Sequence, residues 1–173
     1  GKMGAAVLAA KSALRAGIGL LTCHIPSCGY SIMQSSVPEA MVSTDLNEEA
    51  FSTMPKNLNT YTSIGIGPGL GKAATTLAVL EKTLSSYTQP IVLDADALNL
   101  IAANPSLLNI IPRHSILTPH PGEFKRLFGE TLDDFDRINQ AIYQSKKLDL
   151  YIVLKGKHSF IACPTGVHYF CLL

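Results

Sequence analysis

Hydrophobic positions in this sequence fall into short apolar runs separated by amphipathic segments. Between residues 2 and 16, apolar side chains recur at helical spacing, which predicts an amphipathic helix that ends at Gly17. The same reasoning predicts helices over residues 29–34, 73–84, 97–102, 121–128 and 133–147. It predicts strands over residues 18–25, 39–43, 63–66, 90–93, 115–117, 151–154, 159–162 and 167–170. In the last helix we expect Phe135, Ile138 and Ile142 to face inward, and residues 45–59 to be surface with one helical turn at most.

Most of the expected strands are apolar throughout, without alternation between apolar and polar side chains. Strands that are buried on both faces show this pattern, and their alternation with helices favours a mostly parallel sheet flanked by helices on both faces. The sequence therefore predicts an α/β fold in one domain. The last two strands, joined through residues 164–166, are expected to form a hairpin.

Composition and charge narrow the function classes. The 173 residues are 47% hydrophobic and 16% charged, which is enough for one substantial core, and the formal net charge is +1. With basic residues scattered, the chain has no electrostatic basis for binding nucleic acid. No apolar run approaches membrane-spanning length, so we expect a soluble, cytoplasmic protein without a membrane partner. The four cysteines lack the spacing of a disulfide framework or a zinc site, so buried or incidental thiols are favoured, and we expect no residue of the chain to ligate a metal directly.

The loop at residues 65–71 carries glycine at every second position, between an expected strand and an expected helix. Glycine permits positive φ and the close approach of a ligand to backbone N–H groups, and a helix N-terminus favours anions. The loop fits neither the G-x-G-x-x-G dinucleotide pattern nor the P-loop pattern. A ligand-binding loop and a plain strand-to-helix turn both remain open from these residues alone.

Four polar or glycine-rich segments, residues 65–71, 94–99, 118–123 and 155–159, directly follow expected strands. If these strands are parallel neighbours, the segments meet at one edge of the sheet, where ligands bind in open α/β folds. Asp94 and Asp96 are each suited to bind Mg²⁺ through water or to orient a lysine. For Asp96, a role as helix N-cap is favoured.

Three further residues at these strand ends each allow two interpretations. His120, held between two prolines, is expected to contact a ligand, although a histidine at a helix start also serves as a cap. Glu123 suits the first turn of a helix that begins at Pro121 better than it suits catalysis. Lys155 can reach a phosphate as a point charge, or it is an ordinary lysine at a strand end.

Taken in order, the motifs resemble those of one known family. They read G-I-G-P-G-L-G at 65–71, V-L-D-A-D-A-L-N at 92–99, L-T-P-H-P-G-E-F at 117–124 and V-L-K-G at 153–156, with further matches at 1–6, 13–20 and 37–41. The sequence resembles the ADP- or ATP-dependent NAD(P)H-hydrate dehydratases, the carbohydrate-kinase-like domain of bifunctional nicotinamide-nucleotide repair enzymes. The resemblance covers the whole length, and the combination of motifs is far more specific than any one of them.

The resemblance implies a ribokinase-like three-layer fold and the repair of hydrated NADH and NADPH, in the 6S form. A phosphate from ADP or ATP, with Mg²⁺, is transferred to the ring hydroxyl and then leaves, which regenerates the reduced cofactor. The resemblance implies that the hydrated dinucleotide is contacted by Ala6, Gly67, Gly69, Gly71 and His120. It implies that the adenine nucleotide is contacted by Lys155, Gly156, Lys157, His158 and Ser159, with Asp94, Asp96, Asn99 and Glu123 as candidates for supporting roles.

The resemblance also implies a homotetramer, as in many family members, and the bacterial style of the motifs favours ADP as the donor. One small departure is that Ser159 replaces the usual threonine and keeps its hydroxyl.

A second departure concerns the catalytic residue. A Gly-Ser-Gly-Asp segment, whose aspartate takes the hydroxyl proton in the family, is expected just beyond Phe170 and does not occur among the 173 residues. The expected aspartate would therefore lie beyond Leu173, the last residue of the sequence. We expect a domain truncated at both ends, incomplete at its C-terminus and inactive alone, with no catalytic residue within the chain.

Two other functions are compatible with these residues. One is a small-molecule kinase of the same fold, acting on a hydroxymethylpyrimidine or a sugar. The other is a non-catalytic nucleotide-binding fragment.

Overall fold

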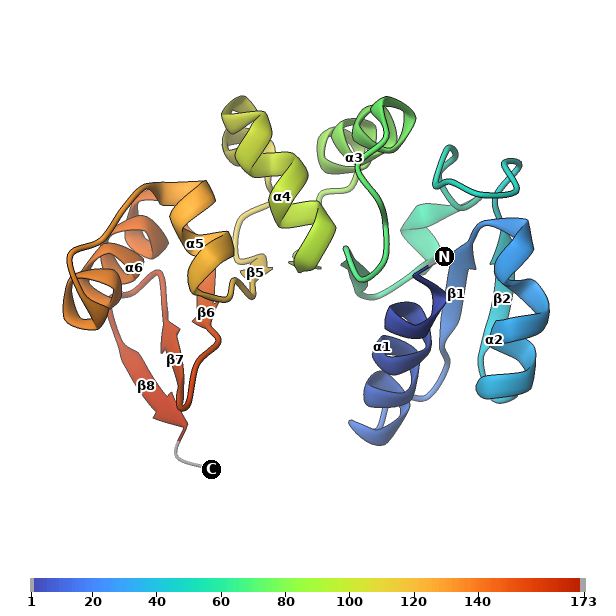
Figure 1. Cartoon of the computed structure of the whole chain (residues 1–173), viewed down its shortest axis with the longest axis horizontal. Helices are drawn as coiled ribbons and strands as arrows, with labels where there is room; N and C mark the ends of the chain where they lie inside the picture. The colour runs from blue at the N-terminus through green and yellow to red at the C-terminus, as the bar shows by residue number, and fades with distance from the viewer. Residues whose placement is uncertain (1, 172–173) are drawn as a thin grey trace. The chain divides into compact units, whose positions relative to one another are not determined.

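The computed structural model describes residues 2–171 of the chain. These residues form two compact units, which Figure 1 shows as ribbons. The first unit contains the residues up to Thr60 together with Pro68–Thr83, and the second contains Tyr61–Gly67 and the residues from Leu84 onward. The loop at residues 65–71, called the glycine loop below, is therefore divided between the two units, with Gly67 in the second unit and Gly69 in the first.

The first unit is built on two short parallel strands, β1 (Thr22–Ile25) and β2 (Met41–Thr44). The helices α1 (Met3–Arg15) and α2 (Tyr30–Ser36) lie beside these strands in Figure 1, and the 3-10 turn η1 (Ser27–Gly29) precedes α2. Helices and strands share a buried core formed by Ala10, Ile25, Met33, Val37 and Ala40. The amphipathic helix expected over residues 2–16 is confirmed.

Residues 45–57 of the first unit form no helix or strand, and the 3-10 turn η2 (Leu58–Thr60) follows them. Thr76, on the helix α3 (Ala74–Ser86), donates its hydroxyl to the Phe51 carbonyl at 3.0 Å, which ties this irregular segment to α3. The expectation of a plain surface stretch is wrong at two positions, because Asp45 is 3% exposed and Phe51 is 8% exposed.

The second unit contains a six-stranded mixed sheet in the order β3-β4-β5-β6-β7-β8. The strands are β3 (Ile64–Ile66), β4 (Ile91–Leu93), β5 (Ile116–Leu117), β6 (Tyr151–Leu154), β7 (Ser159–Ala162) and β8 (His168–Cys171). Strands β3 to β6 pair in parallel, whereas β7 and β8 are antiparallel. The predicted α/β fold with a mostly parallel sheet and a final hairpin is thereby confirmed.

Three helices accompany this sheet: α4 (Ala95–Ala103), α5 (Pro121–Phe128) and α6 (Asp134–Leu148), with the 3-10 segment η3 (Pro105–Ile110) after α4. Ile138 and Ile142 of α6 pack against a buried cluster that includes Phe124 and Ile152, as predicted for these two isoleucines. The prediction for Phe135 is wrong, since its side chain is 71% exposed. Phe135 lies in the first turn of α6, outside the buried cluster against which Ile138 and Ile142 pack.

Several element boundaries differ from the sequence prediction, and two of these differences have a clear structural reason. Helix α4 begins at Ala95, so Asp94 occupies the N-cap position and Asp96 lies in the first turn, which makes the predicted N-cap role of Asp96 wrong. Strand β1 begins at Thr22, although apolar residues precede it, because only residues 22–25 find a pairing partner in β2. Hydropathy marks an apolar run, but the length of a strand depends on the strand that pairs with it.

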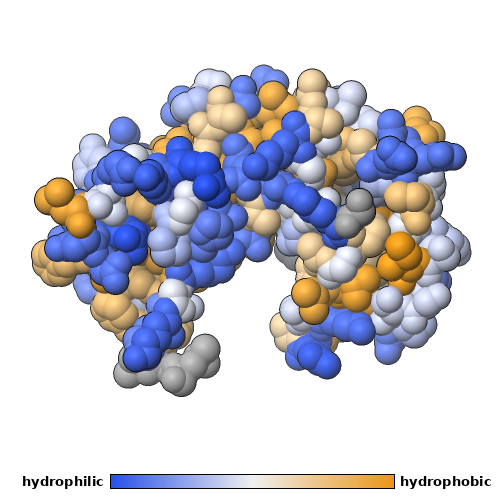
Figure 2. All heavy atoms as spheres, viewed as in Figure 1, coloured by the Kyte–Doolittle hydropathy of each residue, from blue (hydrophilic) through white to orange (hydrophobic). Residues whose placement is uncertain are grey.

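Some large apolar side chains reach the surface, as the orange residues in Figure 2 show. Leu20, Leu46 and Leu132 are 85%, 89% and 95% exposed. Within residues 2–171, no helix combines the length and apolarity needed to cross a membrane.

Candidate functional site

The C-terminal ends of the parallel strands β3 to β6 lie along one edge of the sheet in the second unit. Backbone hydrogen bonds join neighbouring ends. The Asp94 N–H donates to the Ile66 carbonyl at 3.0 Å. The Lys155 N–H donates to the Pro119 carbonyl, also at 3.0 Å. This edge therefore brings together segments that are far apart in the sequence, at the place where open α/β sheets bind ligands.

Gly67, directly after β3, packs against the backbone of Asp94. A Cβ atom on Gly67 would lie 1.7 Å from the Asp94 carbonyl oxygen, and the φ angle of Gly67 is +139°. Glycine alone fits both conditions. The next residue after Asp94, Ala95, has a φ of +48°, a left-handed conformation that is uncommon for residues with a side chain. The ends of β3 and β4 thus hold Asp94 in a close and locally strained backbone geometry.

An ion pair connects Asp94 to Lys155 across the strand ends. Lys155 Nζ donates to Asp94 Oδ1 at 2.6 Å, and Glu123 Oε2 lies 3.8 Å from the same ammonium. Burial favours the neutral form of Asp94, but hydrogen bonds from Lys155 and Thr118 outweigh it and hold the pKa of Asp94 below its usual range. Asp94 is therefore a charged partner of Lys155. The Lys155 side chain remains 40% exposed, which leaves its ammonium accessible to a ligand.

His120 and Glu123 form a reciprocal cap at the start of α5. His120 Nδ1 accepts from the N–H groups of Gly122 at 3.0 Å and Glu123 at 3.4 Å, and Glu123 Oε2 accepts from the His120 N–H at 2.9 Å. This is a capping box with histidine in the place of the usual serine or threonine. Pro121 is the first helical residue and Glu123 is a first-turn charge, both as predicted. His120 is thus a helix cap whose ring stays 49% exposed, and its contact with a ligand remains a prediction.

The other candidate residues of the second unit lie around this network. Asn99 Oδ1 accepts from Arg126 Nε at 2.9 Å, which joins α4 to α5. Asp96 is buried, at 6% exposure. Gly156, Lys157 and His158 form an exposed turn after Lys155, and Ser159 begins β7.

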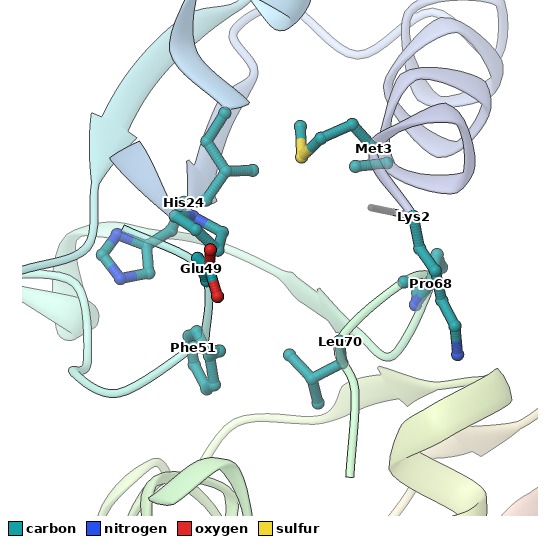
Figure 3. Close-up of a pocket in the computed structure, with 11 residues that line it drawn as sticks. Lys2, Met3, His24, Glu49, Phe51, Pro68 and Leu70 are labelled. Atoms are coloured by element: carbon teal, nitrogen blue, oxygen red, sulfur yellow. The ribbon is translucent and has the colours of Figure 1, made fainter. Parts of the chain in front are cut away.

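The first unit contains a pocket of about 90 Å³. Its walls come from the start of α1, from β1 and the turn after it, from the irregular segment and from the glycine loop: Lys2, Met3, Ala6, His24, Ile25, Pro26, Glu49, Phe51, Pro68, Gly69 and Leu70. Figure 3 shows Glu49 and Phe51 on one side of the pocket and Met3, Lys2 and Pro68 on the other. Small-molecule pockets usually occupy roughly 300–1,000 Å³, so this one can hold only part of a dinucleotide.

Two of the residues predicted to contact the dinucleotide, Ala6 and Gly69, line this pocket together. A Cβ atom on Gly69 would lie 2.7 Å from the Lys2 carbonyl oxygen, and the φ angle of Gly69 is +73°. A glycine at this position therefore lets the loop lie directly against the start of α1. Gly71 does not line the pocket, and among residues 2–171 no heavy atom other than those of its chain neighbours lies within 4 Å of the Cβ position built on it.

A buried carboxylate organises one wall of the pocket. Asp45 accepts hydrogen bonds from three backbone N–H groups, those of Asn47 at 2.9 Å, Ser52 at 2.7 Å and Thr53 at 2.8 Å. Burial favours the neutral form of Asp45, but these hydrogen bonds and that of the Ser52 hydroxyl outweigh it and lower its pKa below the usual range. His24 Nε2 lies 3.0 Å from the Thr53 carbonyl and 3.5 Å from Asp45 Oδ2. Because a carbonyl only accepts, this contact places the proton of His24 on Nε2.

Comparison with known proteins identifies the family. The family model described as NAD(P)H-hydrate dehydratase (Carb_kinase) matches residues 1–172. The chain belongs to this family. The bifunctional NAD(P)H-hydrate repair enzyme Nnr of Moorella thermoacetica is 33% identical over 178 residues, covering 98% of the chain and 34% of the relative. The enzyme of the same description from Coxiella burnetii is 36% identical over 173 residues, covering 99% of the chain and 34% of the relative. The chain thus spans about a third of the length of these curated relatives.

Solved structures show the fold of the dehydratase family. The ADP/ATP-dependent NAD(P)H-hydrate dehydratase from Bacillus subtilis, co-crystallized with ATP/Mg²⁺, matches with a TM-score of 0.77 and 28% identity, over 98% of this chain and 59% of that one. A ribokinase-like superfamily protein from Enterococcus faecalis matches with a TM-score of 0.76 and 25% identity, over 98% of this chain and 58% of that one. The predicted ribokinase-like fold is confirmed.

A hydroxyethylthiazole kinase from Pyrococcus horikoshii also matches, with a TM-score of 0.56 and 13% identity, over 91% of this chain and 63% of that one. Identity this low shows a shared fold alone. It does not favour the alternative of a small-molecule kinase.

The sequence prediction missed several residues of the strand-end network in the second unit and of the pocket wall in the first unit. In the second unit it missed Thr118 and Arg126, although Thr118 directly follows a predicted strand inside a matching motif. In the first unit it missed the buried network of His24 and Asp45. The available signal was an aspartate directly after a strand, followed by Asn47 at a spacing typical of side-chain-to-backbone turns.

One predicted site residue has no position in the structure. The catalytic aspartate was expected beyond Leu173, and both that position and Leu173 itself lie outside the described residues 2–171. The expectation that no catalytic residue lies within the chain therefore stays a prediction.

Proposed function

We propose that this member of the NAD(P)H-hydrate dehydratase family serves the repair of hydrated NADH and NADPH in the 6S form, with ADP or ATP as phosphate donor. Membership of the family over residues 1–172 supports this, as does the likeness to a dehydratase co-crystallized with ATP/Mg²⁺. The observation that carries the proposal is the network of His120, Glu123, Lys155 and Asp94 at the strand ends of the second unit.

In this proposal Lys155 binds a phosphate of the adenine nucleotide. A lysine ammonium has three N–H donors, and Asp94 engages one of them, which leaves donors for a phosphate oxygen. The exposed turn of Gly156, Lys157 and His158 adds backbone N–H groups and positive charge, and Ser159 adds a hydroxyl. Among residues 2–171, no group of three or more His, Cys, Asp or Glu side chains is arranged to hold a metal ion, so we propose that Mg²⁺ enters with the nucleotide.

In the first unit, we propose that the pocket lined by Ala6 and Gly69 takes part of the hydrated dinucleotide. Considered by itself, the second unit offers His120, whose ring is exposed, as a candidate contact for this ligand. Gly67 and Gly71 act by shaping the backbone of the loop. The nucleotide supplies the phosphate that converts the ring hydroxyl into a better leaving group than hydroxide. We extend the proposal to a cytoplasmic protein that assembles as a homotetramer, as the family resemblance implies.

Calorimetric titration of the chain tests this function. We expect binding of ADP or ATP with Mg²⁺ and, separately, of hydrated NADPH. Lys155→Met should weaken nucleotide binding roughly ten- to hundredfold, which corresponds to one charged hydrogen bond of about 1.5–3 kcal/mol. Affinity for hydrated NADPH should not change, because Lys155 is assigned to the nucleotide.

Lys147→Met is the matched control, because it removes the same charge from the last turn of α6. It should bind both ligands as the unaltered chain does. If the unaltered chain bound neither ligand, the proposed function would be wrong. An equal loss in both variants would contradict the role of Lys155 alone.

A further inference from the structure

The three residues that follow His120, namely Pro121, Gly122 and Glu123, form the first turn of α5 and fix the position of its ring. Pro121 is the first residue of α5, a position that suits proline. The ring nitrogen Nδ1 faces the N–H groups of Gly122 and Glu123, at 3.0 Å and 3.4 Å. Backbone N–H groups only donate, so Nδ1 must accept and carries no proton.

The second ring nitrogen consequently carries the proton of the neutral imidazole. His120 Nε2 lies 3.4 Å from Glu123 Oε1, an oxygen that favours an N–H group facing it. The other oxygen of the same carboxylate accepts from the His120 backbone N–H at 2.9 Å. Glu123 therefore contacts both the backbone and the ring of His120. Its own side chain is only 6% exposed, which restricts its movement.

Gly122 provides the room for this arrangement. A Cβ atom at Gly122 would lie 3.0 Å from His120 Cε1 and 3.3 Å from Nδ1, which is tighter than ordinary contact. A side chain at this position would require the ring to shift by a few tenths of an ångström from its place at the helix start. Two charged groups border the arrangement: the Lys155 ammonium lies 3.8 Å from Glu123 Oε2, and Arg126 Nη1 would lie 3.7 Å from the same Cβ position on Gly122.

We propose that Glu123 is a positioning residue that, together with Gly122, holds His120 as a neutral imidazole with its proton on Nε2. The single Nε2 N–H, which lies at a long 3.4 Å from Glu123 Oε1, is then the donor that His120 offers to a ligand oxygen, and this bond replaces or shares the contact with Glu123. Nδ1, which faces the helix start, does not accept a proton from the ligand. The donor role rests on the proposed function, in which His120 meets the hydrated dinucleotide. The oxygens of that ligand include those of its pyrophosphate, its hydroxyls and its amide group.

The tautomer can be measured without any ligand, by NMR of the ring nitrogens in the ¹⁵N-labelled chain at mildly alkaline pH. His120→Asn identifies the His120 signals by their loss. Asparagine is a favoured N-cap residue, so this variant keeps the helix cap. We expect a single tautomer, with Nε2 protonated and Nδ1 accepting. Exchange between both tautomers, as expected for the exposed His158, would overturn the proposal.

Two variants test the positioning role. Glu123→Ala removes both contacts to His120, and Gly122→Ala crowds the ring while leaving Glu123 in place. In each variant the ring should turn away from the backbone N–H groups that face Nδ1, so that the single tautomer becomes an exchanging mixture. Glu123→Gln keeps an acceptor for the backbone N–H of His120 and should retain the single tautomer. Backbone amide spectra check that each variant is folded. A single unchanged tautomer in a folded Glu123→Ala chain would refute the role of Glu123. If the Glu123→Ala chain does not fold, the same measurement on Gly122→Ala tests the proposal instead.

Titration with hydrated NADPH tests the donor role. His120→Asn should bind it about tenfold more weakly, the effect of losing one hydrogen bond. Its affinity for ADP or ATP with Mg²⁺ should be unchanged. Undiminished binding of hydrated NADPH by His120→Asn would refute the donor role. If even the unaltered chain did not bind hydrated NADPH, the proposed function would fail, and the tautomer measurement would still decide whether Glu123 holds the ring.

Discussion

At the end of β3, Gly67 lies so close to β4 that a side chain would collide with the Asp94 carbonyl. The Cβ position is 1.7 Å from that oxygen, and the φ angle of +139° is unfavourable for any other residue. We therefore expect Gly67→Ala to lower the free energy of unfolding by roughly 2–5 kcal/mol, the combined effect of backbone strain and overpacking. Urea unfolding followed by circular dichroism measures this change.

Gly71→Ala separates the two effects. Gly71 also has a positive φ, +82°, but its Cβ position has no heavy atom within 4 Å in the described part of the chain, apart from its own chain neighbours. Its replacement should cost only about 1–2 kcal/mol, from the left-handed backbone alone. Equal losses at Gly67 and Gly71 would show that the contact with Asp94 contributes nothing.

On the scale of elements, the first part of the irregular segment, residues 45–53, forms no helix or strand and is held by Asp45. Three backbone N–H groups and the Ser52 hydroxyl converge on this buried carboxylate. Asp45→Ala leaves these donors without their acceptor. Hydrogen bonds to a charged group contribute about 1.5–3 kcal/mol each, and bonds to water will replace part of this contribution. We expect a loss of roughly 2–4 kcal/mol in the free energy of unfolding, measured by urea titration.

The control for this prediction is Asp134→Ala. Asp134 forms an ion pair with Arg137 on the surface of α6, and its side chain is 89% exposed. Exposed pairs of this kind contribute little, so stability should change by less than about 1 kcal/mol. A similarly small change for Asp45→Ala would mean that the segment is held by other contacts, such as that between Thr76 and Phe51.

The sequence predicts an element best where local chemistry decides it. The bounds of β6 and β7 were predicted to the residue, and α5 begins at Pro121, because proline and a first-turn carboxylate mark a helix start. Asp96 shows the limit. Its side chain suits an N-cap, but the close contact of Gly67 with Asp94 and the left-handed Ala95 place the helix start earlier. Such contacts between distant segments leave no periodic signal.

In the candidate site, too, local features were predictable from the sequence, whereas individual contacts between distant segments were not. That segments after several strands share one edge follows from a parallel sheet and was predictable. The orientation of a lysine was one of two roles predicted for Asp94, and its ion pair with Lys155 confirms that alternative. The identity of this lysine was not predictable, because the two residues are 61 positions apart and their contact depends on strand order. The capping role of His120 was one of two local alternatives, and only the positions of the Gly122 and Glu123 N–H groups reveal it.

For the whole molecule, the two carboxylates with lowered pKa predict how stability depends on pH. Asp45 and Asp94 both have a lower pKa in the folded chain than the usual value of about 3.9. Below that value the unfolded chain binds protons that the folded chain does not, so stability is full above about pH 5 and falls as the pH is lowered. We expect the free energy of unfolding from urea titrations to decrease steadily between about pH 5 and pH 2.

Replacing each carboxylate by its amide assigns this pH dependence. Asp45→Asn cannot titrate, so although it starts less stable, its stability should fall less steeply with decreasing pH than that of the unaltered chain. Asp94→Asn should reduce the slope by a smaller amount, because its partly exposed pair with Lys155 is weakened by solvent and salt. Raising the salt concentration should therefore reduce the contribution of Asp94 and leave that of the buried Asp45 largely unchanged. Identical slopes in all three chains would show that other carboxylates govern the acid sensitivity of the fold.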